Sequence, residues 1–108
     1  MNALPVVLIT GSGRGLGQAF ALTFAEKTHA VALHFNKDKK KAEETAHLIT
    51  KQQGQCDIFG ADVRSSDGVN KMVAAVFKKW GRLDVLINNA GLTQDKLLLN
   101  MRIGRAHV

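Results

Sequence analysis

A glycine-rich segment that directly follows a short apolar run is the feature that most constrains this fold. Residues 6–9 read V-V-L-I, and residues 10–17 read T-G-S-G-R-G-L-G. Continuous apolar character over such a run is typical of a strand buried on both faces. The glycines allow a tight turn without Cβ atoms, and the helical pattern that begins at Leu16 offers N–H groups and the positive end of a dipole to an anion. The segment therefore predicts a phosphate-binding turn between a strand and a helix.

The spacing of these glycines leaves an alternative open. Gly11, Gly15 and Gly17 form G-x-x-x-G-x-G, whereas the common dinucleotide fingerprint has a glycine where Leu16 stands. A glycine cluster also suits a plain strand-to-helix turn, so the order of the remaining elements has to decide between the two.

Strand and helix patterns alternate along the chain. Strands are predicted at residues 5–10, 30–35, 56–61 and 83–88, and helices at about residues 16–27, 38–53 and 66–80. This alternation predicts a Rossmann-type, doubly wound α/β fold with a parallel sheet, in which right-handed crossovers give the strand order 3-2-1-4. Ligands of such sheets bind beyond the carboxyl ends of the strands, which favours the phosphate-binding interpretation. The residues at those ends are Gly11, Phe35, Asp62 and Asn88.

Each helix carries signals for its ends and for its buried face. Asn36 and Asp38 offer cap oxygens to the second helix, which Gly54 is expected to stop. Ser65 or Ser66 is expected to cap the third helix. The positions expected to face the sheet are Leu16, Ala19, Phe20, Thr23 and Phe24 in the first helix, Ala42, Ala46 and Ile49 in the second, and Val69, Met72, Val73, Val76 and Trp80 in the third.

Composition excludes several classes of protein. The 108 residues suit one domain, and 45% hydrophobic residues is normal for a globular chain. The apolar runs are far too short to cross a bilayer and no signal-peptide pattern is present, so we expect a cytoplasmic protein without a membrane partner. Cys56 is the single cysteine and suits a small core residue, and the histidines lack metal-ligand spacing, so neither a disulfide within the chain nor a metal site is expected.

The net charge of +6 favours anionic partners in general. Much of this charge comes from Lys37, Lys39, Lys40 and Lys41, and a solvated helix face is the ordinary explanation of such a run. These lysines have no interleaved aromatic residues and no recognisable nucleic-acid fold accompanies them, so no nucleic-acid partner is expected.

Three segments together resemble the short-chain dehydrogenase/reductase family: residues 10–17, the pair Asp62-Val63, and N-N-A-G at residues 88–91. The intervals between them fit that family as well. Residues 88–101, N-N-A-G-L-T-Q-D-K-L-L-L-N-M, are most similar to 3-oxoacyl-(acyl-carrier-protein) reductases. The resemblance implies hydride transfer between a dinucleotide cofactor and a carbonyl substrate, which an acyl carrier protein carries in a full-length form.

The resemblance also implies the residues that bind the dinucleotide. The pyrophosphate is expected at the backbone of Gly11, Ser12, Gly13, Arg14, Gly15 and Leu16. Gly17 lets the helix approach the sheet. Asp62 corresponds to the acid that binds adenine, and Val63 flanks the ring. Asn88 is expected to bridge two strands, and the nicotinamide ribose is expected beside Asn89, Ala90 and Gly91.

The choice of cofactor follows from charge. Proteins that prefer NAD usually place Asp or Glu about twenty residues after the glycines, where this chain has Phe35 followed by Asn36 and Lys37. Arg14 can reach a 2′-phosphate with its forked donors, although a surface cation on a loop is its alternative role. Asp38 is close enough to oppose that phosphate. We expect NADP (NADPH) in preference to NAD.

After residue 91 the pattern fades, and residues 102–108 (R-I-G-R-A-H-V) have no clear period. We expect a dinucleotide-binding Rossmann half-domain at residues 1–101 and an irregular tail at residues 102–108, in a chain truncated after the fourth strand. That strand would then leave an exposed apolar edge, so a homo-oligomer is expected.

Catalysis in the family that this chain resembles uses a Ser, Tyr and Lys relay, but this sequence contains no tyrosine. Ser12, Ser65 and Ser66 belong to other motifs, so no catalytic residue is assigned. The expected function is that of an NADP-dependent oxidoreductase whose catalytic segment is absent from this chain. The alternative is a non-catalytic nucleotide-binding module, or an inactive truncated fragment, that self-associates.

Overall fold

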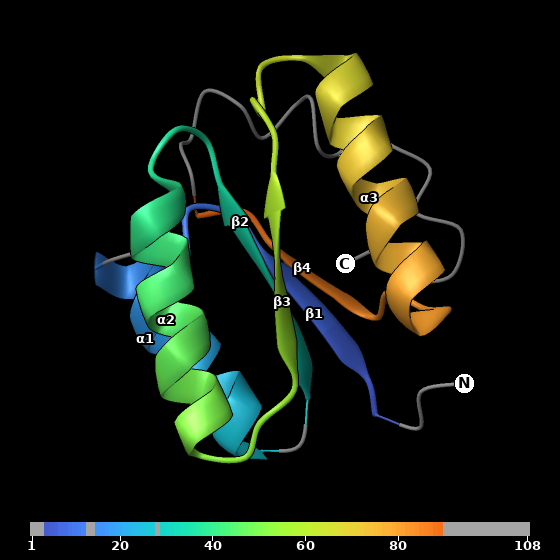
Figure 1. The fold of residues 1–108 in the computed structure, drawn as a ribbon. Coiled ribbons are helices and arrows are strands. Elements are labelled where there is room, and N and C mark those ends of the chain that lie inside the picture. Colours follow the sequence, from blue (N-terminus) through green and yellow to red (C-terminus); the bar gives the residue numbers. More distant parts are fainter. Residues whose placement is uncertain (1–3, 13–14, 28, 90–108) are drawn as a thin grey trace.

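The computed structural model describes residues 4–12, 15–27 and 29–89, in which four strands and three helices alternate (Figure 1). The strands are β1 (Val6–Ile9), β2 (Ala30–Phe35), β3 (Cys56–Gly60) and β4 (Val85–Ile87). The helices are α1 (Gly15–Lys27), α2 (Lys39–Lys51) and α3 (Ser66–Trp80). All strands are parallel and lie in the order β3-β2-β1-β4. The predicted Rossmann-type fold and its strand order are therefore confirmed, although β4 is shorter than predicted.

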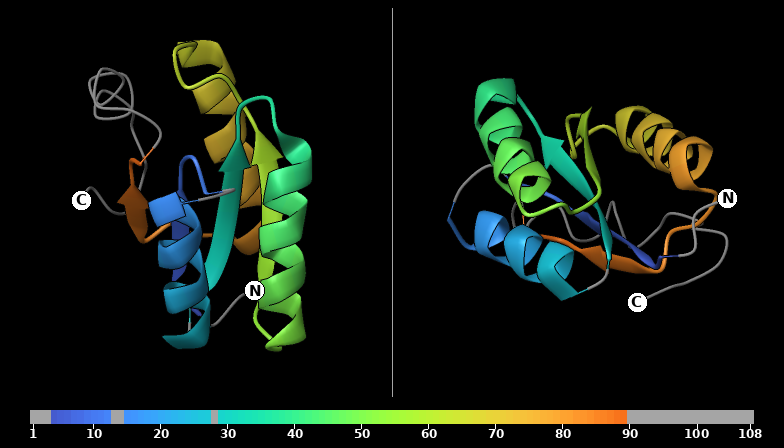
Figure 2. Two further views of the ribbon diagram at one scale, coloured as in Figure 1. Left: turned by 90° about the vertical axis from the view of Figure 1, so that its left-hand side faces the viewer. Right: turned by 60° about the horizontal axis from the view of Figure 1, so that its bottom comes forward.

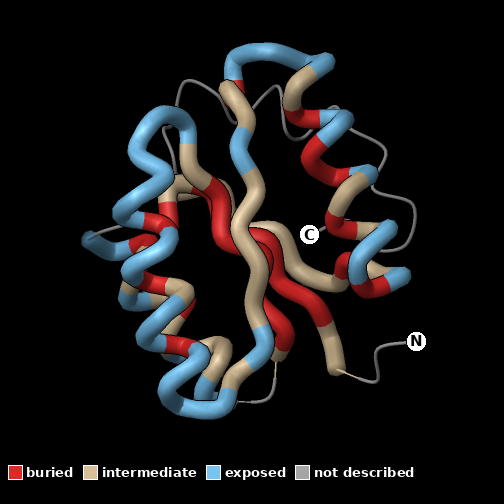
Figure 3. Tube along the Cα trace, in the orientation of Figure 1, coloured by how far each residue is buried: buried red, intermediate tan, exposed pale blue. Residues whose placement is uncertain are grey.

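The sheet lies between α1 and α2 on one face and α3 on the other (Figures 1 and 2). Alternate residues of β1 serve the two faces: Val6 and Leu8 pack toward α3, while Val7 and Ile9 pack toward α1 and α2. All four are fully buried, and Figure 3 shows burial concentrated along β1 and β2. Burial on both faces explains why this strand has no polar alternation.

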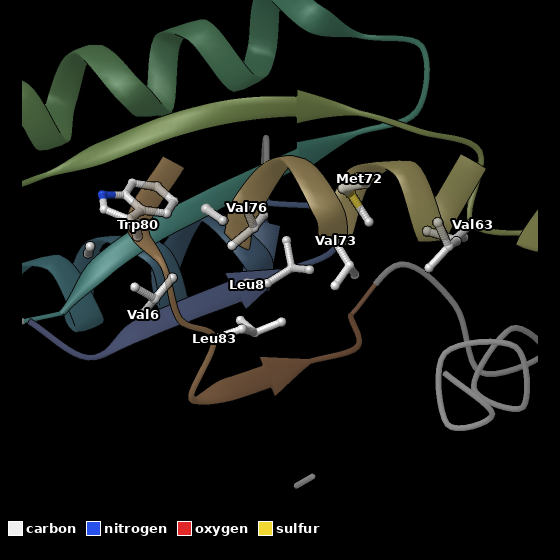
Figure 4. Packing of buried hydrophobic residues seen from close by; sticks show 11 residues of the cluster. Val6, Leu8, Val63, Met72, Val73, Val76, Trp80 and Leu83 are labelled. Carbon is white, nitrogen blue, oxygen red and sulfur yellow. The ribbon is translucent and has the colours of Figure 1, made fainter. Parts of the chain in front are cut away.

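Helix α3 covers its face of the sheet with the apolar stripe that its spacing predicted. All five predicted positions are buried, and Figure 4 labels four of them, all except Val69, where they pack toward β1. They are Val69, Met72, Val73, Val76 and Trp80. Ser65 caps this helix by accepting a 3.1 Å hydrogen bond from the Gly68 amide. None of the three helices in the described ranges is long and apolar enough to cross a bilayer.

The predicted buried face of α1 was only partly right. Phe20 and Phe24 pack against the core, whereas Leu16, Ala19 and Thr23 are exposed. Gly17 and Ala21 are buried instead. Because α1 is apolar around most of its circumference, residue spacing does not define one face, and close packing at Gly17 sets the orientation.

The start of α2 agrees with prediction and its end does not. The Asp38 side chain accepts a 3.1 Å hydrogen bond from the Lys41 amide and so caps the helix. The left-handed residue after the helix is Gln53, with φ of 65°, and not Gly54. Gly54 is required for a different reason, since a Cβ there would lie 2.7 Å from Cγ2 of Ile49.

Candidate functional site

The glycine turn lies at the carboxyl end of β1. Gly11 has φ of 64° and Gly15, the first residue of α1, has φ of 63°. Glycine adopts this left-handed conformation without the steric cost that a Cβ brings. Leu16 follows and is 63% exposed. Two predicted members of the turn, Gly13 and Arg14, lie outside the described residues.

Gly17 brings α1 against the turn. A Cβ on this residue would overlap the carbonyl oxygen of Gly11 and would lie 2.6 Å from Nδ2 of Asn89. No side chain fits between these groups, so the beginning of α1 is held directly over the end of β1. The N-terminus of α1 therefore lies at the carboxyl edge of the sheet, beside the glycine turn.

Polar groups clamp the ends of β1 and β4 together. The Thr10 hydroxyl donates to Oδ1 of Asn88 at 3.0 Å and accepts from the amide of Asn89 at 2.9 Å. Nδ2 of Asn89 donates to the Gly11 carbonyl at 3.2 Å. Asn88 thus bridges two strands, as predicted, and Asn89 fixes the turn itself. Ala90 and Gly91 lie outside the described residues.

His34, which the sequence did not predict as a site residue, joins the turn to β2 and β3. Its Nδ1 accepts from the Gly11 amide at 2.9 Å, and its Nε2 lies 2.7 Å from the carbonyl oxygen of Ala61. Its side chain is 1% exposed. The signal that could have found it is a lone polar residue within an otherwise apolar strand.

Ser12 is buried and held by neighbours on two other elements. Its hydroxyl accepts from the His34 amide at 2.9 Å. Its carbonyl accepts from the Thr45 hydroxyl at 3.4 Å, and that hydroxyl also accepts from Nε2 of Gln18 at 3.0 Å. The network connects the turn to α1 and α2. The Ser12 amide also donates to the His34 carbonyl at 3.3 Å, so the hydroxyl, amide and carbonyl of Ser12 all bind protein groups, and its role at a pyrophosphate stays a prediction.

A pocket of about 260 Å³ opens beside the turn. It is lined by Gly11, His34, Phe35, Asn36, Lys37, Asp38 and Lys41. Two lysines therefore line the pocket. Lys37 was predicted from the sequence as a cofactor-binding residue, and Lys41 was not. Asp38 brings the one carboxylate among these residues, and its Oδ1 is engaged in capping α2.

Asp62 and Val63 follow β3 but differ in their surroundings. Both oxygens of Asp62 accept from the Arg64 guanidinium, at 3.1 and 3.0 Å, and these hydrogen bonds hold the pKa of the carboxyl below its usual range. Val63 is only 3% exposed and packs under α3. The roles of both residues beside an adenine ring stay predictions.

Cys56 lies half-buried, and its Sγ is 3.6 Å from the Ala46 carbonyl oxygen. Burial raises the pKa of this thiol, so the thiolate is disfavoured. This agrees with a packing role. Among the described residues, no group of three His, Cys, Asp or Glu side chains could hold a metal ion.

Comparison with known proteins decides the family. The sequence profile of the family described as short chain dehydrogenase matches residues 5–105. The chain belongs to the short-chain dehydrogenase/reductase family.

Two curated relatives and one solved structure show the extent of the likeness. The chain is 39% identical over 102 residues to the 3-oxoacyl-[acyl-carrier-protein] reductase FabG of Staphylococcus aureus, which covers 94% of this chain and 42% of that protein. It is 36% identical to the short-chain dehydrogenase/reductase homolog YusS of Bacillus subtilis, which covers 87% of each. A metagenomic short-chain oxidoreductase, solved in complex with NADP, matches with a TM-score of 0.77 and 30% identity over 82% of this chain and 39% of that one. The chain thus spans about two fifths of the length of the reductase relative.

Proposed function

We propose that this chain binds NADP in preference to NAD at the carboxyl edge of its sheet, as the nucleotide-binding part of a reductase similar to the 3-oxoacyl-[acyl-carrier-protein] reductases. The observation that carries the proposal is the pocket beside the glycine turn. Lys37 and Lys41 line it, and the carboxylate of Asp38 is turned to the α2 amide. A doubly charged phosphate would meet two lysines there against one carboxylate, whose Oδ1 is engaged in capping α2.

The turn fits a pyrophosphate. The first four N–H groups of α1, from Gly15 onward, have no partner within the helix. Its first turn carries no acidic residue, so the positive end of the helix dipole is not neutralised. The absence of a Cβ at Gly17 leaves α1 close to the turn, and a phosphate can approach the backbone there.

The adenosine end of the ligand would lie over β2. Phe35 is half-buried and occupies the place where an acid would bind the ribose hydroxyls. Asn36 and Lys37 follow it and are exposed. The NADP complex of a structural neighbour supports the same choice. Arg14 remains a proposed partner of the 2′-phosphate.

The nicotinamide, when bound, supplies the hydride for carbonyl reduction. The residues of this chain bind and orient the dinucleotide, and none is assigned a catalytic role because the sequence has no tyrosine to act as the proton donor. The substrate that we propose for the activity is a 3-oxoacyl thioester carried by an acyl carrier protein. This choice is supported by the name of the Staphylococcus aureus relative.

Calorimetric titration with NADPH and NADH tests the cofactor assignment. Lys41→Ala and Arg14→Ala should each weaken NADPH binding by roughly tenfold or more, because a charge-assisted hydrogen bond is lost, and should leave NADH binding nearly unchanged. Phe35→Asp should move the preference toward NADH. Lys71→Ala is the matched control, since it removes the same charge from an exposed position on α3. Equal losses for both ligands would withdraw the NADP assignment.

Self-association through β4 is the second candidate role. Among the described strands, β4 pairs with β1 alone, and its three residues are only partly buried. Such an edge offers main-chain groups to another strand. Light scattering over a range of concentrations tests this, and a monomer at every concentration would exclude it.

A further inference from the structure

His34 connects three strand ends at the pocket. One ring nitrogen, Nδ1, accepts from the Gly11 amide after β1, and the other, Nε2, meets the Ala61 carbonyl after β3. The main chain of His34 accepts from and donates to Ser12 of the turn. The imidazole is nearly inaccessible to solvent, so its partners are protein groups.

These contacts determine the protonation state of the ring. The Gly11 amide can only donate, so Nδ1 has to present its lone pair. Nε2 therefore carries the proton and donates to the Ala61 carbonyl, which makes the imidazole neutral. An imidazolium would direct an Nδ1–H at the Gly11 N–H, and both hydrogen-bond donors would face each other.

The charged groups around the imidazole come from the β2–α2 connection, from α2 and from the segment after β3. Lys37, Asp38 and Lys41 line the same pocket. The charge of Asp62, the residue after Ala61, also acts on the ring, and its carboxylate is paired with Arg64. Helix α1 brings no acidic residue in its first turn.

We infer that His34 is a positioning residue for the dinucleotide: by accepting from the Gly11 amide, its neutral imidazole holds the turn that presents the α1 N-terminus to the pyrophosphate. This inference rests on the proposed dinucleotide binding. Gly11 needs such a restraint because glycine populates left-handed and right-handed backbone conformations almost equally. Protonation of His34 breaks the restraint, so dinucleotide affinity falls as the medium becomes acidic.

Burial is consistent with this behaviour. Desolvation lowers the pKa of His34 below its ordinary value of 6.5, and it outweighs the Ala61 hydrogen bond and the charge of Asp62, which act in the opposite direction. The neutral form is therefore the native form near neutral pH.

Two substitutions separate the two ring nitrogens. His34→Asn places a carboxamide oxygen near the position of Nδ1, where it can accept from Gly11, and cannot reach Ala61. His34→Gln reaches the position of Nε2 and leaves the Gly11 amide without its acceptor. At about pH 8, where His34 is neutral, His34→Asn should bind NADPH within about twofold of the unaltered chain and His34→Gln about tenfold more weakly. Equal weakening of both variants would overturn the inference, because it would point to a structural role alone.

The pH profile supplies the second readout. The NADPH affinity of the unaltered chain is divided by that of His34→Asn at each pH, so that titration of the ligand's own phosphate cancels. This ratio is followed from about pH 8 to about pH 5.5. This ratio should fall by up to about tenfold for each pH unit below the pKa of His34. A ratio that stays constant through the pH range in which His34 takes up a proton would contradict the inference. A ratio that rises on acidification would show that the imidazolium attracts the phosphates, and it would contradict the inference as well.

Magnetic resonance of the full chain without ligand tests the same contact even if a variant does not fold or if NADPH does not bind. Absence of NADPH and NADH binding at every pH would refute the proposed function and with it the positioning role, whereas NADPH binding that His34→Gln does not weaken would refute the positioning role alone. The ring ¹⁵N shifts should show the Nε2–H tautomer at neutral pH. The Gly11 amide should exchange faster with solvent once His34 is protonated. An Nδ1–H tautomer, or a Gly11 amide that is insensitive to that protonation, would overturn the inference.

Discussion

The carboxylate of Asp84 accepts a 2.8 Å hydrogen bond from the amide of Val6, and so fastens the beginning of β4 to the beginning of β1. The main chains pair at the same place, where the Asp84 amide donates to the Val6 carbonyl at 2.9 Å. Arg82 donates to both oxygens of this carboxylate, each at 2.8 Å. At the opposite end of the two strands, Thr10 and Asn88 form the second clamp. Strand β4, which Asn88 and Asn89 of the site follow, is thus held to β1 at both ends.

Replacing Asp84 should therefore loosen β4. Asp84→Ala is expected to lower the free energy of unfolding by about 2 kcal/mol, because it removes a charged acceptor from a backbone amide and from Arg82. Asp67→Ala is the control, since that side chain is 87% exposed and its pair with Lys71 spans 3.9 Å. The control should cost no more than about 1 kcal/mol. Urea denaturation followed by the fluorescence of buried Trp80 measures both, and similar losses would contradict the role of Asp84.

The turn after α2 stores strain that a single substitution can remove. Gln53 has φ of 65°, a conformation that costs a side-chain-bearing residue about 1–2 kcal/mol. Gln53→Gly should raise the free energy of unfolding by about 0.5–1 kcal/mol after the greater chain entropy of glycine is subtracted. Gln52→Gly is the matched control: Gln52 has φ of −89°, so glycine brings only the entropy loss. Stabilisation by the control, or none by Gln53→Gly, would refute the strain.

Local patterns predicted those parts of the fold that local physics determines. The apolar run of β1, the stripe of α3 and the cap at Asp38 depend on neighbours within a turn or a strand, and each is confirmed. The two faces of α1 carry similar apolar residues, so the orientation of that helix depended on a contact between Gly17 and a turn that spacing does not reveal.

The polar contacts of the site follow a different rule. His34 meets Gly11 across 23 residues, Thr45 meets Ser12 across 33, and Asp84 meets Val6 across 78. A histidine or threonine in a sequence does not indicate which distant backbone group it will satisfy. The glycines and asparagines were selected because their motif is local, whereas their buried partners became visible only when the strand ends were brought together.

Two glycines of the turn should respond differently to a methyl group. Gly17→Ala is expected to cost about 3 kcal/mol or more, since the new Cβ overlaps the Gly11 carbonyl oxygen and neither backbone can yield without moving α1. Gly15→Ala should cost only about 1–2 kcal/mol, because its Cβ would meet nothing within 4 Å and only the left-handed φ is unfavourable. Denaturation midpoints compare the two. The reverse order would mean that α1 is not held by the contact at Gly17.

The stability of the chain should decline on mild acidification, and His34 supplies the sign. Burial lowers the pKa of His34 in the folded chain below 6.5, so near that pH the unfolded chain binds a proton that the folded chain rejects. The stability that neutral His34 contributes is therefore fully present above pH 6.5 and is lost as the pH falls toward the lowered pKa. The free energy of unfolding then declines by at most about 1.4 kcal/mol per pH unit. Asp62 does not interfere with this measurement. Its pKa in the folded chain lies below the ordinary value of 3.8, so the stability that Asp62 contributes is lost only as the pH falls from about that value toward its lowered pKa.

Urea denaturation of the unaltered chain and of His34→Asn isolates the histidine, since the difference between their free energies of unfolding should narrow as the medium is acidified. Parallel curves would show that His34 titrates equally in the folded and unfolded chains, and a widening difference would show an imidazolium stabilised by Asp62.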